Sequence, residues 1–384
     1  MNKKKLFRIT TVPISIEKLL GNQLTYMNRF FVVTAISSDR KELEKIGKEL
    51  GIKTYSIEMT RQITPIRDFR SLYQMYRFFK KEKPEIVHTH TPKAGLIGML
   101  AAKLAGVKIR LHTVAGLPLM ETSGIKRQIL NFVEKLTYSC ATNIYPNSFG
   151  LHHFILKEKF CKKEKLKVIG NAGSNGIDIE YFNPLLISEQ QKLKLKTELK
   201  ISAEDFVFIF VGRLVKDKGI NELIHAFDNL SISDSKLLLV GNFESELNPL
   251  FPDTLRLIKE NPNIISVGYQ KDVRDYFAIS DALVFPSYRE GFPNVVLQAG
   301  AIELPAIVTD INGCNEIIEN EVNGIIIPPK DEFSLKNAML RIVNDEYLRL
   351  TLKKNSRQII VSRYEQKQFW KALLVEYQNL ILKV

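Results

Sequence analysis

Cysteine is scarce in this sequence of 384 residues, and it follows no recognisable pattern. The three cysteines, Cys140, Cys161 and Cys314, are odd in number and show neither CxxC spacing nor a histidine at zinc-ligand spacing. A disulfide framework and a zinc site are therefore both disfavoured. We expect the chain to work in the reducing cytosol.

Long apolar runs and familiar nucleotide-binding motifs are also missing. No stretch of about 18 apolar residues occurs, so a membrane-spanning helix is not expected. Arg8, two threonines and Pro13 interrupt any apolar centre of an export signal in MNKKKLFRITTVPISI, which we interpret as containing a first strand. Neither GxGxxG nor GxxxxGK[ST] is present, which disfavours a dinucleotide fingerprint and a P-loop. No solenoid period or low-complexity tract is visible.

Acidic residues are few in the first half of the chain. Residues 1–180 hold 31 Lys and Arg against 15 Asp and Glu, a net charge of +16, whereas residues 181–384 hold 24 against 27, a net charge of −3. A basic surface of this kind suits nucleic acid, an anionic membrane leaflet or a phosphorylated substrate. Solvated lysines that only keep the protein soluble are the alternative.

Strand-like apolar runs alternate with amphipathic helical runs from end to end, which is typical of parallel α/β units. Helices are expected between the strands, for example over 69–81 and 94–105. The predicted strands cover residues 6–12, 30–36, 54–57, 86–89, 108–113, 142–146, 167–169, 207–211, 236–240, 264–267, 282–285, 306–309 and 324–327.

The chain is long enough for two domains, each with its own core. GNAGSNGIDIEYFNP (170–184) is rich in Gly and Asn and is expected to be the hinge, and a helix over 188–199 opens the second domain. We therefore predict a first domain over 1–182 and a second over 183–363, facing each other across a cleft. A final helix within 364–384 has an apolar face and is predicted to cross back to the first domain.

The loop after the strand at 207–211 carries two cations. Gly212 allows a sharp turn at the strand end, and Arg213 and Lys218 then place positive charge where open parallel sheets bind ligands. Two cations suit a diphosphate. A solvated loop that merely contains basic residues is the alternative.

The stretch SYREGFPNVVLQAGA follows the strand at 282–285. The amide groups of Gly291, Phe292 and Asn294 lie at the start of a predicted helix over 294–303 and can bind an anion. Glu290 would repel phosphate, but a carboxylate and the amide of Gln298 both suit sugar hydroxyls. Phosphate and hydroxyl groups together indicate a nucleotide sugar. The alternative is an exposed helix start and a surface amide, although the helix is apolar nearly all round.

These segments resemble a known family. GRLVKDKG, PSYREGFPN, VTDINGCNEII and NGIIIPP are similar to the nucleotide-binding half of the family-four retaining glycosyltransferases, which have the GT-B fold. HTHTPKAGLIGMLAAKLAGV, RLHTVAGLP, YPNSFGL and KVIG with SNGID resemble bacterial members that extend lipid-linked oligosaccharides for capsule or O-antigen. The resemblance covers nearly the whole chain. It implies a nucleotide-diphosphate sugar donor, usually a UDP-sugar, retention of anomeric configuration, and no metal ion or other cofactor.

The resemblance also implies roles for individual residues. Arg213 and Lys218 would neutralise the donor diphosphate and stabilise the leaving group, and Glu290 would hold hydroxyls of the donor sugar. The turn of Gly291, Phe292 and Pro293 would cradle sugar and phosphate, and Tyr269 would flank the base.

Two positions depart from the family pattern. Gln298 stands where the family has a second glutamate that grips the ribose, which weakens the expected hold on the donor by about 1 to 2 kcal/mol. Ala115 stands where a histidine often contacts the donor, so that contact is missing or is supplied by His112.

The first domain offers fewer candidates. His88 and His90 fall at a strand end and Lys93 at a helix start, where His90 or Lys93 would meet acceptor or donor phosphate. A packed or hydrogen-bonded histidine pair is the alternative, and a metal site is disfavoured because no third ligand is close. The first loop lacks the family's Gly-Gly pair, but Gly21 is expected to open a helix near the leaving phosphate.

Two basic segments with apolar positions favour a membrane surface over nucleic acid. LHHFILKEKFCKKEK (151–165) and IKRQILNFVEKL (125–136) combine lysines and Arg127 with apolar faces, so the first domain is expected to rest on the anionic inner leaflet of the cytoplasmic membrane. Ordinary surface helices are the alternative. Nucleic acid is disfavoured because no basic strip interleaved with aromatic residues occurs.

The function that the sequence predicts is a hexosyl- or N-acetylhexosaminyltransferase of retaining type. It would move a sugar from a UDP-sugar to an undecaprenyl-diphosphate-linked saccharide in capsule, O-antigen or other surface polysaccharide synthesis. A UDP-sugar 2-epimerase of the same fold and a non-catalytic scaffold in polysaccharide assembly are the alternatives.

Overall fold

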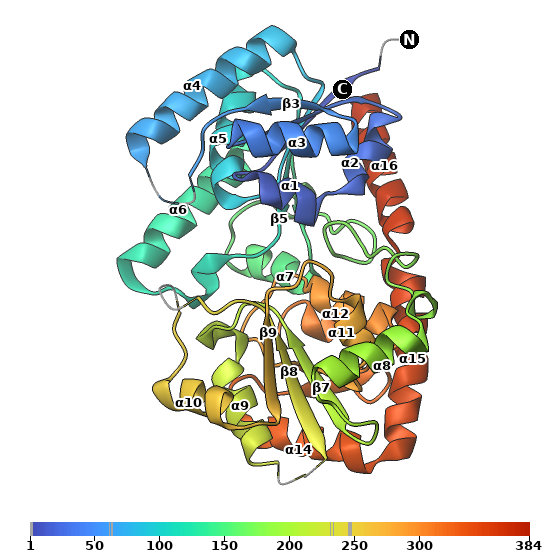
Figure 1. Cartoon of the computed structure of the whole chain (residues 1–384). Helices are drawn as coiled ribbons and strands as arrows, with labels where there is room; N and C mark the ends of the chain where they lie inside the picture. The colour runs from blue at the N-terminus through green and yellow to red at the C-terminus, as the bar shows by residue number, and fades with distance from the viewer. Residues whose placement is uncertain (1–2, 61, 63, 231, 233, 245–247) are drawn as a thin grey trace. The chain divides into compact units, whose positions relative to one another are not determined.

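The computed structural model describes the chain except residues 1–2, 61, 63, 231, 233 and 245–247 (Figure 1). Contacts divide the chain into two compact units. The first contains Met1–Gly176 and Lys367–Val384, and the second contains Ile177–Gln366.

The first unit is built on a parallel sheet of six strands in its described part, in the order β3-β2-β1-β4-β5-β6. The chain runs outward from β1 in one direction, then returns to place β4 on the other side of β1, so the topological switch point lies between β1 and β4. The strands are β1 (Lys5–Ile9), β2 (Val32–Ser37), β3 (Lys53–Ser56), β4 (Ile86–Thr89), β5 (Ile109–Val114) and β6 (Asn143–Pro146).

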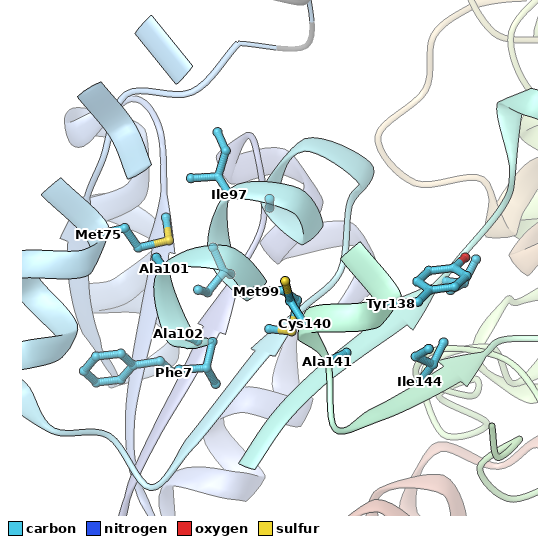
Figure 2. Close-up of a cluster of buried hydrophobic side chains, with 14 of the residues drawn as sticks. Phe7, Met75, Ile97, Met99, Ala101, Ala102, Tyr138, Cys140, Ala141 and Ile144 are labelled. Carbon is cyan, nitrogen blue, oxygen red and sulfur yellow. The ribbon is translucent and has the colours of Figure 1, made fainter. Parts of the chain in front are cut away.

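Helices cover both faces of this sheet because side chains of a strand alternate between its two faces. On β1, Phe7 joins an apolar core with α4, α5, α6 and α7, part of which is drawn in Figure 2, whereas Leu6 joins a second core with α1, α2, α3 and α16. The helices are α1 (Pro13–Leu19), α2 (Asn22–Asn28), α3 (Arg40–Leu50), α4 (Pro65–Glu82), α5 (Pro92–Ala105), α6 (Gly124–Cys140), α7 (Phe149–Lys157) and α16 (Gln366–Leu382), with 3-10 turns η1 (Pro118–Glu121) and η2 (Lys163–Lys165).

The second unit repeats the plan. Its described residues form a parallel six-stranded sheet in the order β12-β11-β10-β7-β8-β9, with the switch point between β7 and β10. The strands are β7 (Phe206–Val211), β8 (Ser235–Val240), β9 (Ile264–Gly268), β10 (Ala282–Phe285), β11 (Ala306–Thr309) and β12 (Gly324–Ile327). Its helices are η3 (Pro184–Leu186), α8 (Glu189–Glu198), η4 (Lys216–Lys218), α9 (Ile220–Asp228), α10 (Pro252–Glu260), α11 (Arg274–Ala278), α12 (Asn294–Ala301), α13 (Cys314–Ile317), α14 (Glu332–Asn344) and α15 (Glu346–Tyr364).

Twelve of the thirteen predicted strands correspond to a strand of the structure, with ends that differ by at most three residues. The prediction of a strand over 167–169 is wrong. The pairing here is limited to an isolated bridge between Leu166 and Ile144 and a hydrogen bond from the amide of Lys167 to the carbonyl of Ile144. The chain then turns at Gly170.

The boundaries between the two units lie a few residues from the predicted domain boundaries: the chain passes between units after residues 176 and 366 rather than after residues 182 and 363. Ile177 pairs with the end of α15, since its amide donates to the carbonyl of Tyr364 at 2.8 Å, and Arg357 donates to the carbonyl of Phe182 at 2.8 Å. Residues 177–182 therefore belong with the second unit. Tyr364 ends α15, and the last helix, α16, begins at Gln366 and packs with the first unit.

Among the described residues, no helix is both long and apolar enough to cross a membrane.

Candidate functional site

The loops that follow β7 and β10 meet at the switch point of the second unit, where open parallel sheets bind ligands. The amide of Tyr288 donates to the carbonyl of Asp217 at 2.9 Å. Gly219 has a φ of 70°, and a Cβ there would lie 2.1 Å from the carbonyl oxygen of Pro286. Only glycine allows the two loops to approach so closely.

This approach pairs two predicted site residues. The ammonium group of Lys218 forms an ion pair with the carboxylate of Glu290, and both side chains are only 16% exposed. The hydroxyl of Ser287, which is fully buried, donates to the same carboxylate oxygen of Glu290 at 2.9 Å. Two donors therefore fix the direction of the carboxylate, while the neighbouring cation balances its charge.

The other predicted cation, Arg213, lies in the same loop. It follows Gly212, whose φ of 154° is a backbone conformation that favours glycine, and its Nη1 lies 2.8 Å from Oε2 of Glu244. The guanidinium is half exposed, so an anionic ligand can compete with Glu244 for it. Arg213 is thus an accessible cation, whereas Lys218 is a largely buried one.

The turn of Gly291, Phe292 and Pro293 is buried and braced by the loop after β11. The side-chain amide of Asn312 donates to the carbonyls of Glu290 and Gly291 at 3.0 and 2.9 Å. A Cβ on Gly313 would lie 2.5 Å from the carbonyl oxygen of Gly291. The turn is therefore held rigidly at the start of α12, with amide groups at the positive end of the helix.

The remaining residues of this unit that were predicted to bind the sugar donor are accessible to solvent. Asn294 begins α12 and is exposed, and Gln298, one turn later, is partly exposed although its neighbours Val296, Leu297 and Ala299 are buried. Tyr269 follows the edge strand β9 and is 59% exposed. Both the amide and the phenol ring are thus available to a ligand.

In the first unit the predicted histidines are buried and bonded to protein groups. His88 contacts the hydroxyls of Tyr377 at 2.6 Å and Thr113 at 2.7 Å, and His112 contacts the hydroxyl of Thr89 at 2.8 Å. Burial lowers the pKa of His88 well below its usual value and that of His112 to about 4, so both rings are neutral at pH 7.

His90 is also buried, and its Nε2 accepts a hydrogen bond from Nε of Arg8 at 3.0 Å. Burial lowers the pKa of His90 as well. The rings of His88 and His90 lie with their centres 4.2 Å apart, which is the packed, hydrogen-bonded arrangement expected of a structural pair.

Lys93 and Gly21 have local roles in the structure. Nζ of Lys93 lies 2.8 Å from Oδ1 of Asp68, and the Lys93 side chain is 12% exposed. The ion pair therefore balances the charge of Lys93 and links the start of α5 to α4. Gly21 precedes α2 with a φ of 44°.

Within the described ranges, His, Cys, Asp and Glu side chains form no group of three or more that is arranged to hold a metal ion.

Three groups that position the site were not predicted from the sequence. Ser287 fixes Glu290, Asn312 fixes the turn, and Glu244 pairs with Arg213. Ser287, Asn312 and Glu244 lie in the loops that follow β10, β11 and β8. Ligands of open parallel sheets bind at such loops, so this rule could have pointed to all three residues.

Comparisons with known proteins agree with this architecture. A family model described as glycosyl transferases group 1 matches residues 191–359, and one described as glycosyl transferase 4-like matches residues 24–148. The chain is 35% identical over 384 residues to the capsular polysaccharide biosynthesis glycosyltransferase CapM of Staphylococcus aureus, covering 99% of this chain and 98% of CapM. It is 34% identical to the UDP-Gal:alpha-D-GlcNAc-diphosphoundecaprenol alpha-1,3-galactosyltransferase of Escherichia coli, covering 94% of each.

Solved structures match at the level of the fold. The Anabaena Alr3699/HepE complex with UDP has a TM-score of 0.81 at 18% identity, covering 98% of this chain and 100% of that one. A glycosyltransferase from Rickettsia africae has a TM-score of 0.82 at 18% identity, covering 99% of each chain. The chain belongs to the group 1, family-four type of glycosyltransferases with the GT-B fold, and it is a transferase.

Proposed function

We propose that this chain is a retaining glycosyltransferase that moves a sugar from a UDP-sugar to a saccharide carried on a lipid diphosphate of undecaprenyl type. The observation that carries the proposal is the paired Lys218 and Glu290 beside the start of α12, at the switch point between β7 and β10. The two relatives named above support a lipid-linked acceptor in polysaccharide synthesis, because one is named for capsular polysaccharide biosynthesis and the other for a diphosphoundecaprenol acceptor.

The donor diphosphate lies against the amide groups at the start of α12, with Lys218 and Arg213 as its cations. Arg213 exchanges Glu244 for a phosphate oxygen, and Lys218 contacts the diphosphate while it still balances Glu290. Both cations stabilise the negative charge that develops on the leaving diphosphate as the bond to the sugar breaks. Without the pairing, the carboxylate of Glu290 would repel the phosphates.

Glu290 accepts hydrogen bonds from hydroxyls of the donor sugar, and Gln298 holds the ribose more weakly than a glutamate would. The leaving diphosphate takes the proton of the acceptor hydroxyl as the new glycosidic bond forms on the same face of the sugar. The reaction proceeds without a metal ion, because the two cations and the helix start supply the stabilising charge. The sugar is a hexose or an N-acetylhexosamine.

The first unit is proposed to rest on the inner face of the cytoplasmic membrane, where a lipid-linked acceptor is found. On α6, Ile125, Ile129 and Phe132 are 76%, 48% and 67% exposed and follow helical spacing. Lys126 and Lys135 flank them. Exposed apolar residues on a basic helix suit an anionic leaflet.

A second helix of this unit has the same character. Ile66, Phe69 and Tyr73 of α4 are 89%, 71% and 54% exposed at spacings of three and four residues, and Arg67 and Arg70 lie among them. Both α4 and α6 pack against α5 (Figure 1).

The proposal is tested by donor screening followed by transfer. Calorimetry with UDP, GDP and their sugars is expected to show binding of UDP. Incubation of the selected UDP-sugar with an undecaprenyl-diphosphate-linked saccharide is expected to extend the acceptor by one sugar, and NMR of the product is expected to show the anomeric configuration of the donor. Inversion at that carbon would contradict a retaining reaction.

The same materials separate the alternatives. An epimerase would convert UDP-N-acetylglucosamine with no acceptor present, whereas this chain is expected to leave it unchanged. Transfer to any lipid-diphosphate acceptor would exclude a purely structural scaffold.

Membrane binding is tested by sedimentation with vesicles. Vesicles containing phosphatidylglycerol are expected to retain the protein, and Phe132→Ser is expected to weaken retention several-fold. Tyr347→Ser is the matched control, because Tyr347 is 83% exposed on the second unit. Equal retention of both variants would contradict the assigned surface.

A further inference from the structure

Tyr288 and Glu222 form a hydrogen bond close to the ion pair of Lys218 and Glu290. The hydroxyl of Tyr288, in the loop after β10, donates to Oε1 of Glu222 in the first turn of α9 at 2.5 Å. Burial and the nearby carboxylate raise the pKa of Tyr288, so the phenol keeps its proton at pH 7 and is the donor. The bond therefore joins the loop that carries Glu290 to the helix that follows Lys218.

The carboxylate of Glu222 depends on this bond. Its other oxygen, Oε2, is buried and has no hydrogen-bond partner among the residues that the structure describes. A buried carboxylate oxygen without a donor is costly, whereas a hydrogen bond from a hydroxyl to a carboxylate is short and strong. The hydroxyl of Tyr288 is therefore the group that stabilises Glu222 in this position.

The backbone and the ring of Tyr288 are held as well. Its amide donates to the carbonyl of Asp217 at 2.9 Å, and Nζ of Lys330 lies 4.8 Å from the centre of its ring. The next residue, Arg289, places its Nη2 3.3 Å from Oδ2 of Asp217. The loop after β10 is thus attached to the segment after β7 by both backbone and side chains.

The position of this loop decides where the carboxylate of Glu290 lies. Ser287, whose hydroxyl donates to that carboxylate, precedes Tyr288 directly, and Glu290 follows it by two residues. A shift of Tyr288 therefore moves both Ser287 and Glu290 relative to Lys218, which belongs to the other loop. Displacements of about 1 Å are enough to cost an enzyme much of its rate.

We propose that Tyr288 and Glu222 are positioning residues of the transfer reaction, and that their hydrogen bond sets the carboxylate of Glu290 against the hydroxyls of the donor sugar. This role rests on the proposed function of the site. UDP alone has no sugar for Glu290 to hold, so the bond contributes to turnover of a UDP-sugar and not to binding of UDP.

Tyr288→Phe tests the role because it removes only the hydroxyl. The kcat for transfer from a UDP-sugar is expected to fall about tenfold. The Kd for UDP, measured by calorimetry, is expected to change by less than about twofold. Tyr347→Phe is the matched control, since it removes a hydroxyl from a tyrosine of the same unit that is 83% exposed. An unchanged kcat in Tyr288→Phe, or a loss of UDP affinity as large as the loss of kcat, would overturn the role.

A double variant separates positioning from stabilisation of the fold. Tyr288→Phe alone leaves a buried carboxylate without a donor, so its Tm is expected to be about 3 °C lower. Tyr288→Phe combined with Glu222→Met removes both polar partners, and its Tm is expected to return to within about 1 °C of the wild type while kcat stays about tenfold low. Recovery of kcat together with Tm would show that the bond only stabilises the fold. If Tyr288→Phe does not fold, the double variant decides.

Glu222→Gln provides a conservative comparison, because the amide keeps an acceptor oxygen for the phenol. Its kcat is expected to fall by less than about threefold, and a loss as large as that of Tyr288→Phe would contradict the role of the hydrogen bond.

The wild type separates this inference from the function on which it rests. Absence of transfer from any UDP-sugar by the wild type would overturn the proposed function and the positioning role together. Transfer that is equally fast in the wild type and in Tyr288→Phe would overturn the positioning role alone.

Discussion

Lys218 and Glu290 are 72 residues apart in the chain, yet their side chains form a largely buried ion pair at the ends of two neighbouring strands. The pair places a cation and a carboxylate side by side at the start of α12. In the proposed reaction the cation stabilises the leaving diphosphate and the carboxylate holds the sugar. The two roles meet at the bond that breaks.

Replacement of Lys218 tests this arrangement. Lys218→Ala is expected to lower kcat/KM at least about 100-fold, because a charge aimed at the leaving group is lost and Glu290 is left unbalanced. Lys216→Ala is the matched control, since Lys216 lies in the same 3-10 turn with its ammonium group 4.9 Å from the centre of the Phe251 ring. Steady-state kinetics with a UDP-sugar check the prediction, and near-normal turnover of Lys218→Ala would contradict the mechanism.

Gln298→Glu is expected to strengthen donor binding. Gln298 is partly exposed one turn into α12, so a carboxylate there can accept a charge-assisted hydrogen bond from a ribose hydroxyl. The expected gain is about 1 kcal/mol, or roughly a fivefold lower Kd for UDP. Calorimetry measures this change, and an equal or weaker Kd would show that Gln298 does not contact the ribose.

Two glycines with nearly the same φ allow the cost of backbone strain to be measured separately from the cost of a steric clash. Gly219 and Gly268 have φ values of 70° and 69°, but only Gly219 would place a Cβ against another residue, 2.1 Å from the carbonyl oxygen of Pro286. Gly268→Ala is expected to lose about 1 to 2 kcal/mol of unfolding free energy from conformation alone. Gly219→Ala is expected to lose at least about 1 kcal/mol more. Denaturant unfolding compares the two, and equal losses would show that the loops move apart easily.

Glu134 makes stability depend on pH. Burial raises the pKa of this α6 carboxylate from its ordinary 4.5 to about 7, so the folded state holds the proton where the unfolded state has released it. Stability is therefore expected to fall by about 3 kcal/mol as pH rises from about 4.5 to about 7, and to lose no more above that range.

The variant Glu134→Gln is expected to remove this dependence and to be more stable than the wild type at pH 8. Glu164→Gln is the control, because Glu164 is exposed. Unfolding free energies measured from pH 4 to pH 8 check the prediction, and a slope unchanged in Glu134→Gln would assign the dependence to another group.

The strands were predictable because each is a short apolar run with clear limits. The strands at 86–89, 282–285, 306–309 and 324–327 have the predicted bounds, since apolar residues there are bounded by polar ones or by Gly and Pro. Lys167–Ile169 has a similar composition and follows Leu166, which bridges Ile144 on the edge strand β6, but the chain turns at Gly170 before a ladder extends, so it forms no strand. Local pattern does not contain that information.

The candidate site was predictable in its residue types but not in its partners. Arg213, Lys218 and Glu290 were predicted from the loops that follow strands. The ion pair and the bonds from Asn312, however, join residues 21 or more positions apart, and the bond from the buried hydroxyl of Ser287 depends on the turn geometry. Their contacts exist only after the strands have been ordered in the sheet.

By itself, the sequence determined the succession of strands and helices, the two-domain plan and the glycine-bearing loops, because these follow from local polarity, spacing and backbone freedom. Tertiary structure alone decided which charges are neutralised. It paired Lys218 with Glu290 and Lys93 with Asp68, and it buried Arg8 beside His90 with one donor left without a protein partner among the described residues. The reason is that a charge is stabilised or left unbalanced by the groups a few ångströms away, and those neighbours are set by the order of strands in the sheet rather than by the order of residues in the chain.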